Sequence, residues 1–176
     1  MTLSRARCLI LACGNTLRED DGVGPWLAEW AENRFRSEAD VRVLSRQQWT
    51  PELAEEIVHA QSVLFIDCSV DSAPGSVSLT PVVPAAGNPG LATHHQGAAE
   101  LLALGRDLYN SSPLQAQLLT IGAGSIGLGE VFSDQVTAAL SYACSLLEET
   151  VLRSLAGSKH EEQVERSAGQ PDAGSL

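Results

Sequence analysis

Two adjacent carboxylates, Asp20 and Asp21, lie in a glycine-rich turn near the beginning of the chain. The turn follows a short apolar run at residues 8–13, which predicts a buried strand. Glycines on both sides of the acid pair allow the backbone to bend and to approach a ligand closely. Neighbouring acids at a strand end suit a hard cation, a proton transfer or a peptide amine. The same pattern also describes a solvated acidic turn that caps a helix, so the turn alone leaves both interpretations open.

Other candidate ligands stand at comparable places further along the chain. Asp67 ends an apolar run at residues 62–67, and His94 and His95 precede a helical pattern. In an open α/β sheet, ligands bind outside the carboxyl ends of the strands, so we expect these side chains to converge with the acid pair. Each residue singly also has a structural explanation, such as a helix cap. Together, two carboxylates and an imidazole form a plausible metal site with open positions for substrate.

Apolar periodicity predicts the elements that would position these residues. Strands alternate with helices along the whole chain, which predicts an α/β three-layer sandwich: a mostly parallel sheet of about five strands with helices on both faces. Thr50 is the expected cap of the second helix, with Pro51 at its first position, and Thr93 and Ser133 are the expected caps of the third and fourth. The expected strands lie near residues 8–13, 41–45, 62–67, 76–83 and 117–121.

Composition points to one domain with a tail. The length of 176 residues suits a single core, which we place at residues 1–156. Residues 157–176 are rich in Gly, Ser, Ala, Glu and Gln and contain no periodic apolar face. We therefore expect this segment to be a disordered C-terminal tail.

Charge and cysteine usage limit the possible partners and compartment. The net charge of −11 disfavours binding to nucleic acid or to an anionic membrane surface. The four cysteines form no C-x-x-C pair, which favours reduced thiols in a cytoplasmic protein. The apolar run at residues 8–13 is too short for a signal peptide or a membrane span, which supports the same compartment.

Three motifs resemble those of a known family. The pattern G-N-x-L-x-x-D-D-G-x-G at residues 14–24 is similar to the opening motif of the hydrogenase maturation proteases, the endopeptidases that process the large subunit of nickel–iron hydrogenases. Residues 65–68 followed by Pro74-Gly75 resemble the second signature of that family, and Thr93-His94 resembles the third. Segments 48–52 and 120–122 are also similar, so the resemblance extends over about residues 8–152.

The resemblance implies a phosphorylase/hydrolase-like fold and an aspartyl-type endopeptidase. Such an enzyme removes the C-terminal extension of the hydrogenase large-subunit precursor after nickel insertion. The catalytic and metal-contacting triad carried over from the family is Asp21, Asp67 and His94. The nickel is expected from the substrate, with no permanent cofactor, and the chain is expected to act as a monomer. His94 is preferred to His95 because it follows Thr93 and lies six residues before Glu100.

The sequence leaves alternatives for the ligand acid, the hydrolysis mechanism and the class of protein. Asp21 is assigned as the ligand from its position before Gly22, although Asp20 adjoins it. Hydrolysis could use a carbonyl or water activated by the metal, or a carboxylate as general base. A receiver domain that accepts a phosphoryl group would need a lysine near its last strand, and the only lysine is Lys159. A dinucleotide-binding domain would need G-x-G-x-x-G in its first turn; the turn after residues 8–13 lacks this pattern, and its two carboxylates would repel a pyrophosphate. A non-catalytic metal- or peptide-binding module is the remaining alternative.

Overall fold

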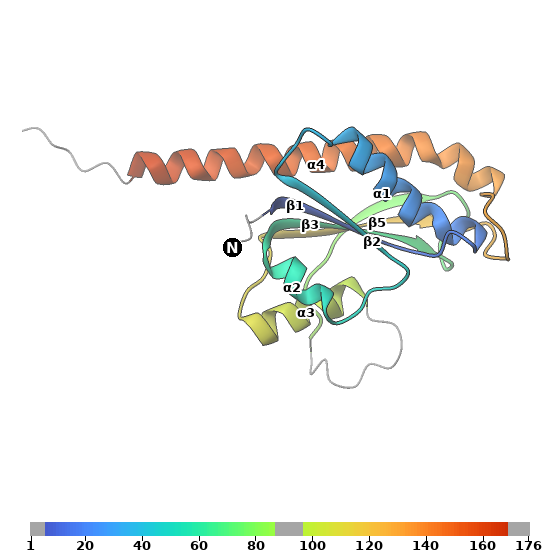
Figure 1. Ribbon diagram of the computed structural model, residues 1–176, viewed down its shortest axis with the longest axis horizontal. Helices are drawn as coiled ribbons and strands as arrows, with labels where there is room; N and C mark the ends of the chain where they lie inside the picture. Colours follow the sequence, from blue (N-terminus) through green and yellow to red (C-terminus); the bar gives the residue numbers. More distant parts are fainter. Residues whose placement is uncertain (1–5, 87–96, 169–176) are drawn as a thin grey trace, which may run out of the picture.

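A five-stranded sheet forms the centre of the molecule and carries helices on both faces (Figure 1). The computed structural model describes residues 6–86 and 97–168. The strands are β1 (Ala6–Cys13), β2 (Val41–Arg46), β3 (Ala60–Ser69), β4 (Val77–Pro81) and β5 (Gln115–Gly122). The helices are the short 3-10 helix η1 (Glu19–Gly22), α1 (Val23–Arg34), α2 (Leu53–Val58), α3 (Ala98–Tyr109) and α4 (Asp134–Ala168).

The strand order is β2-β1-β3-β5-β4, and only β4 runs antiparallel to its neighbour. In the parallel part, Leu11 of β1 pairs with Leu44 of β2 on one side and with Phe65 of β3 on the other. The antiparallel β4 occupies the edge of the sheet beside β5. The predicted α/β architecture with a mostly parallel sheet is therefore confirmed.

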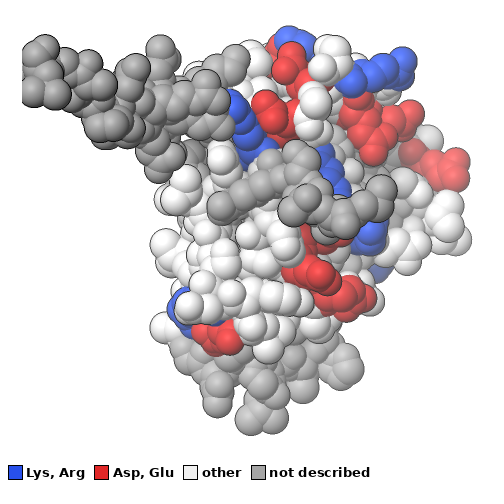
Figure 2. Space-filling model, turned by 60° about the vertical axis from the view of Figure 1, so that its left-hand side comes forward, with Lys and Arg blue, Asp and Glu red and all other residues white. Residues whose placement is uncertain are grey.

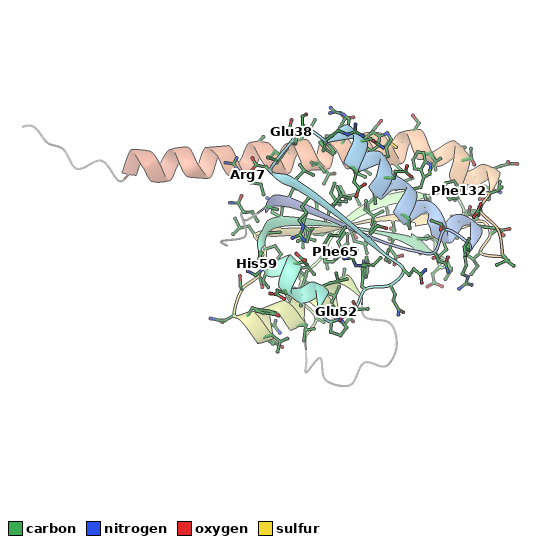
Figure 3. All side chains as sticks on the ribbon, in the orientation of Figure 1. Arg7, Glu38, Glu52, His59, Phe65 and Phe132 are labelled. Carbon is green, nitrogen blue, oxygen red and sulfur yellow. The ribbon has the colours of Figure 1, made fainter. Side chains whose placement is uncertain are left out.

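Alternating side chains of the strands divide the core into two layers. One face packs against α1 and α4, and the opposite face packs against α2 and α3 (Figure 1). Successive strand residues point to opposite faces, so Ile10 belongs to the first layer and Leu11 to the second. Few aromatic side chains take part, and the largest fully buried one is Phe65 (Figure 3). The core is therefore mainly aliphatic.

The chain order creates a crevice between β1 and β3. From β1 the chain moves to β2 on one side and then returns to β3 on the other side. The loops that leave the carboxyl ends of β1 and β3 therefore diverge, which is the arrangement that forms ligand sites in open α/β sheets. Asp67 lies on β3, two residues before its end. Asp21 lies in η1, which follows the loop after β1.

Two of the predicted helix beginnings differ from expectation. The helix α2 begins at Leu53 instead of Pro51, because residues 50–52 form a turn. In that turn, the backbone N–H of Leu53 donates to the carbonyl of Thr50 at 3.0 Å, and no side chain caps the helix. The helix α3 begins at Ala98 with Gly97 as its N-cap, and Thr93 lies outside the described residues.

The cap predicted for α4 is confirmed. The backbone N–H of Val136 donates to Oγ of Ser133 at 3.3 Å. The backbone of α4 is helical to Ala168, so residues 157–168 are described as helix, whereas the composition predicts a disordered tail from residue 157. The last turns of this helix extend beyond the sheet in Figure 1. The boundary between a domain at residues 1–156 and a tail at residues 157–176 stays a prediction.

Three further observations concern the helices, the surface charge and the cysteines. Among the helices that the structure describes, none has the length and apolar composition needed to cross a bilayer. On the face shown in Figure 2, basic side chains are scattered among acidic ones, which differs from the clustered basic patches of nucleic-acid-binding proteins. The four cysteines are free thiols, as predicted.

Candidate active site

Glycines shape the turn that presents the acid pair. Gly14 has a φ of +143°, and a Cβ at this position would lie 1.9 Å from the carbonyl oxygen of Asp21. A Cβ at Gly24 would lie 2.1 Å from the carbonyl oxygen of Cys13. Any larger residue at either position would force the backbone segments apart. The two glycines therefore let η1 and the beginning of α1 fold back against the end of β1.

Asp20 is a structural residue. Its side chain is fully buried and accepts four hydrogen bonds, from the backbone N–H groups of Gly124, Ser125 and Ser133 and from Oγ of Ser133, at 2.7–2.8 Å. Burial alone would raise the pKa of Asp20, but the bonds from Ser133, Ser125 and Gly124 together lower it below the usual value. Asp20 thus ties the turn after β1 to the segment between β5 and α4.

Asp21 points to a different environment. Its Oδ2 accepts a hydrogen bond from the backbone N–H of Asn15 at 3.0 Å. The side chain of Asn15 in turn accepts from the backbone N–H of Leu17 at 2.9 Å, which fixes the turn. Within residues 6–86 and 97–168, no hydrogen bond engages the other carboxylate oxygen of Asp21. The half-buried Asp21 therefore keeps one oxygen available for a ligand.

Asp67 is held by a thiol and an amide. Its Oδ1 accepts hydrogen bonds from Sγ of Cys13 at 3.1 Å and from the backbone N–H of Cys68 at 2.8 Å. Burial raises the pKa of Asp67 above the usual value; the two hydrogen bonds oppose this change, and the charge of Asp21 adds to it. In the described part of the chain, Oδ2 of Asp67 has no hydrogen-bond partner.

Asp21 and Asp67 border a common cavity of about 480 Å³ at the carboxyl ends of β1 and β3. Asp20 does not line this cavity, which separates the roles of the two adjacent acids. His94 and His95 lie outside the described residues, and Gly97, the first described residue after them, lines the cavity. The cavity is lined by Cys13, Gly14, Asn15, Arg18, Asp21, Gln47, Gln48, Trp49, Asp67 and Gly97.

The metal site therefore cannot be built from the described part of the chain alone. No group of three or more His, Cys, Asp or Glu residues within residues 6–86 and 97–168 is placed to hold a metal ion. Two carboxylates with free oxygens fit a divalent cation as a partial ligand set. The further ligands would have to come from elsewhere.

The two cysteines beside the acids are poor nucleophiles. Burial, followed by the charges of Asp21, Asp67 and Asp20, raises the pKa of Cys68 to about 12. Burial and the charges of Asp67 and Asp21 also raise the pKa of Cys13 well above the usual value. Both side chains are thus protonated thiols at neutral pH, and a thiolate mechanism is disfavoured.

Sequence reasoning missed two contributors to the cavity. Cys13 was predicted only as a strand residue, although it donates to Asp67 across 54 positions of sequence. Trp49 lies in a segment noted only for its family resemblance. Its ring packs edge-on against Phe65, with centroids 5.3 Å apart, and forms a wall of the cavity. The position of Cys13 directly before the glycine turn is the one signal that could have indicated its role.

Comparison with known proteins gives a consistent family of structures. No model of a protein family and no curated protein matches the chain. Among solved structures, the hydrogenase maturating endopeptidase HybD from E. coli aligns with a TM-score of 0.64 and 21% identity, over 86% of this chain and 93% of that one. The [NiFe] hydrogenase maturation protease HybD from Thermococcus kodakarensis aligns with a TM-score of 0.57 and 26% identity, over 82% and 98%. The protease HycI from the same organism aligns with a TM-score of 0.59 and 22% identity, over 82% of this chain and 91% of that one.

These observations define an α/β protein with an acidic cavity at the switch point of its sheet. The chain has the fold of the hydrogenase maturation proteases, which confirms the resemblance that its motifs indicate. At these identities the comparison establishes the fold.

Proposed function

We propose that this chain is the endopeptidase that removes the C-terminal extension from a nickel–iron hydrogenase large-subunit precursor after nickel insertion. One observation carries the proposal. Asp21 and Asp67 come from two different strand ends and share one cavity, and each has a carboxylate oxygen without a hydrogen bond in the described part of the chain. Asp20, which adjoins Asp21, is fully engaged in structural hydrogen bonds.

The nickel of the precursor would be bound by Asp21, Asp67 and His94. Carboxylate oxygens and a neutral imidazole are suitable ligands for a divalent transition metal. Three protein ligands leave the coordination shell incomplete, so the precursor would supply the others. Precursor without nickel would therefore lack the group that these side chains recognise. The metal belongs to the substrate in this proposal and is not a resident cofactor.

Hydrolysis transfers water across the scissile peptide bond, and the cavity offers two ways to assist it. The substrate nickel can polarise the carbonyl or activate the water. Alternatively, Asp21 or Asp67 can accept the proton of the attacking water as a general base. In either case Trp49 contributes a wall of the cavity, and the protonated thiol of Cys13 contributes a hydrogen bond to Asp67 instead of a nucleophile. The reaction would take place in the cytoplasm.

A cleavage assay tests the proposal. The purified chain is incubated with candidate large-subunit precursors, with and without nickel, and the mass of the C-terminus is measured. Loss of the C-terminal extension only from nickel-loaded precursor is the expected result. Binding of the precursor without any change of mass would instead identify a non-catalytic binding module.

A further inference from the structure

A second hollow lies next to the turn at residues 14–22 that carries Asp20 and Asp21, called the acid turn below. This hollow shares no lining residue with the candidate active site. Asn15, Arg18 and Asp21 face the active-site cavity, whereas Thr16 and Gly22 of the same turn face the second hollow. Its volume is about 210 Å³, below the roughly 300–1,000 Å³ typical of small-molecule sites. The size suits a single side chain of another protein.

Two aromatic rings form an apolar wall of this hollow. The rings of Trp26 and Phe132 meet edge-on, with centroids 6.4 Å apart and planes at 82°. Trp26 is 37% exposed although it lies on a helix whose other face is buried. Phe132 lies beside the first turns of α1 in Figure 3, and Pro25 completes this wall. An exposed tryptophan ring attracts the cationic end of an arginine or lysine.

Two carboxylates flank the rings. Glu29 lies one turn after Trp26 on α1, and Glu130 lies two residues before Phe132. Both side chains are exposed, and neither forms an ion pair with a basic residue in the described part of the chain. Aromatic rings beside two unpaired carboxylates select for a guanidinium or ammonium group.

The two loops that carry Thr16 and Glu130 of the hollow also expose large apolar side chains, which indicates a protein surface as the ligand. Leu17, Ile126, Leu128 and Val131 are 40–91% exposed. The loops that carry them are fastened together, because the backbone N–H of Gly129 donates to the carbonyl of Leu17 at 3.0 Å. Large apolar side chains gathered beside a charged hollow are typical of protein interfaces. A free amine or a single ion would leave them uncovered.

We propose that this hollow receives a lysine or arginine side chain of the hydrogenase large-subunit precursor and thereby docks it against the acid turn. The identity of the partner rests on the function proposed above, and the chemistry of the hollow is independent of it. Gly22 lines the hollow and directly follows Asp21, which lines the active-site cavity. A precursor seated here would therefore lie against the segment that carries the catalytic carboxylate.

The test compares two double variants that remove the same charge. Glu29→Gln/Glu130→Gln neutralises the hollow, and Glu32→Gln/Glu38→Gln neutralises two exposed acids outside it. Processing of nickel-loaded precursor should show a KM about tenfold higher for the first variant, with kcat unchanged, because two partly screened charge contacts are lost. Its KM should also depend less on salt than the KM of wild type. Trp26→Ala should raise KM in the same way, and the control double variant should match wild type.

The outcomes separate this proposal from the proposed function. If wild type cleaves the precursor and the Glu29→Gln/Glu130→Gln variant has an unchanged KM, the docking proposal is overturned and the protease function stands. If wild type cleaves no precursor, its affinity for immobilised precursor is measured instead, and a tenfold weaker affinity of the same variant supports docking without proteolysis. If sedimentation shows that wild type is a dimer and that this variant is a monomer, the hollow binds a second copy of the chain, and the proposal is wrong.

Discussion

Ser133 binds Asp20 with both its backbone amide and its hydroxyl, each at 2.7 Å. The same hydroxyl also accepts the backbone N–H of Val136 and caps α4. One serine therefore connects the turn after β1 with the beginning of the last helix. This connection explains why one acid of the adjacent pair is buried while the other lines the cavity.

Substitution of Asp20 should reduce stability, whereas substitution of Asp21 should reduce activity. Asp20→Asn would place an amide hydrogen-bond donor among four donors in a buried site, and we expect it to lower the free energy of unfolding by about 2–4 kcal/mol. Asp21→Asn should change stability by less than about 1 kcal/mol because its side chain is only half-buried, yet it should abolish processing. Urea denaturation and the cleavage assay measure the two quantities. A stable Asp20→Asn protein together with an unfolded Asp21→Asn protein would reverse the assignment.

The contribution of Asp20 to the free energy of unfolding should decrease as the pH falls. The pKa of Asp20 is lower in the folded protein than in the unfolded chain, where a value of about 3.9 is usual. The ionised side chain therefore stabilises the fold fully above the unfolded value, and this stabilisation is lost as the pH falls through the folded pKa. The difference in unfolding free energy between wild type and Asp20→Asn should stay constant from pH 8 to about 5 and shrink below about pH 4. A difference that grows on acidification would contradict the lowered pKa.

Cys13 should act through Asp67 as a positioning residue. Cys13→Val keeps the size and apolar packing but removes the donor to Oδ1 of Asp67, so the carboxylate loses one of its two hydrogen bonds. A lost hydrogen bond of about 1 kcal/mol predicts a fall in kcat/KM of about five- to tenfold. Cys13→Ser restores a donor and should recover most of the activity. Equal losses in both variants would indicate a packing role instead.

The tail should be dispensable for folding. Val151 is the last fully buried residue of α4 among those whose side chains are described, and the end of the helix extends beyond the sheet (Figure 1). Truncation after Ala156 should therefore leave the thermal melt nearly unchanged. Truncation after Leu146, which removes Leu147 and Val151 from the core, is the destabilising control. A loss of more than about 2 kcal/mol on removal of residues 157–176 would show that the tail is packed.

Local patterns in the sequence predict the sheet, the two helical layers and the positions of Asp21 and Asp67 at strand ends. The position before Gly22 assigns Asp21 as the ligand, but no local pattern predicts the buried structural role of Asp20, because its partners lie more than 100 positions away, at Gly124, Ser125 and Ser133. The beginning of α2 is also mispredicted, since the Thr50-Pro51 pair serves a turn here. Tertiary contacts determine the role of Asp20 and the beginning of α2, and a local sequence pattern does not specify such contacts.

The last prediction concerns the source of the metal and the choice of histidine. Asp21, Asp67 and His94 would supply three ligands, so the protein alone should hold nickel weakly and should hold it more firmly when the precursor adds further ligands. Wild type should therefore leave nickel-free precursor uncut. His94→Ala should abolish processing of nickel-loaded precursor, while the matched variant His95→Ala should retain it, and thermal melts should show both variants folded. Mass measurement of the precursor C-terminus gives the readout. Full-rate cleavage of nickel-free precursor would exclude the nickel of the substrate as the recognised group, and activity lost only in His95→Ala would move the third ligand by one residue.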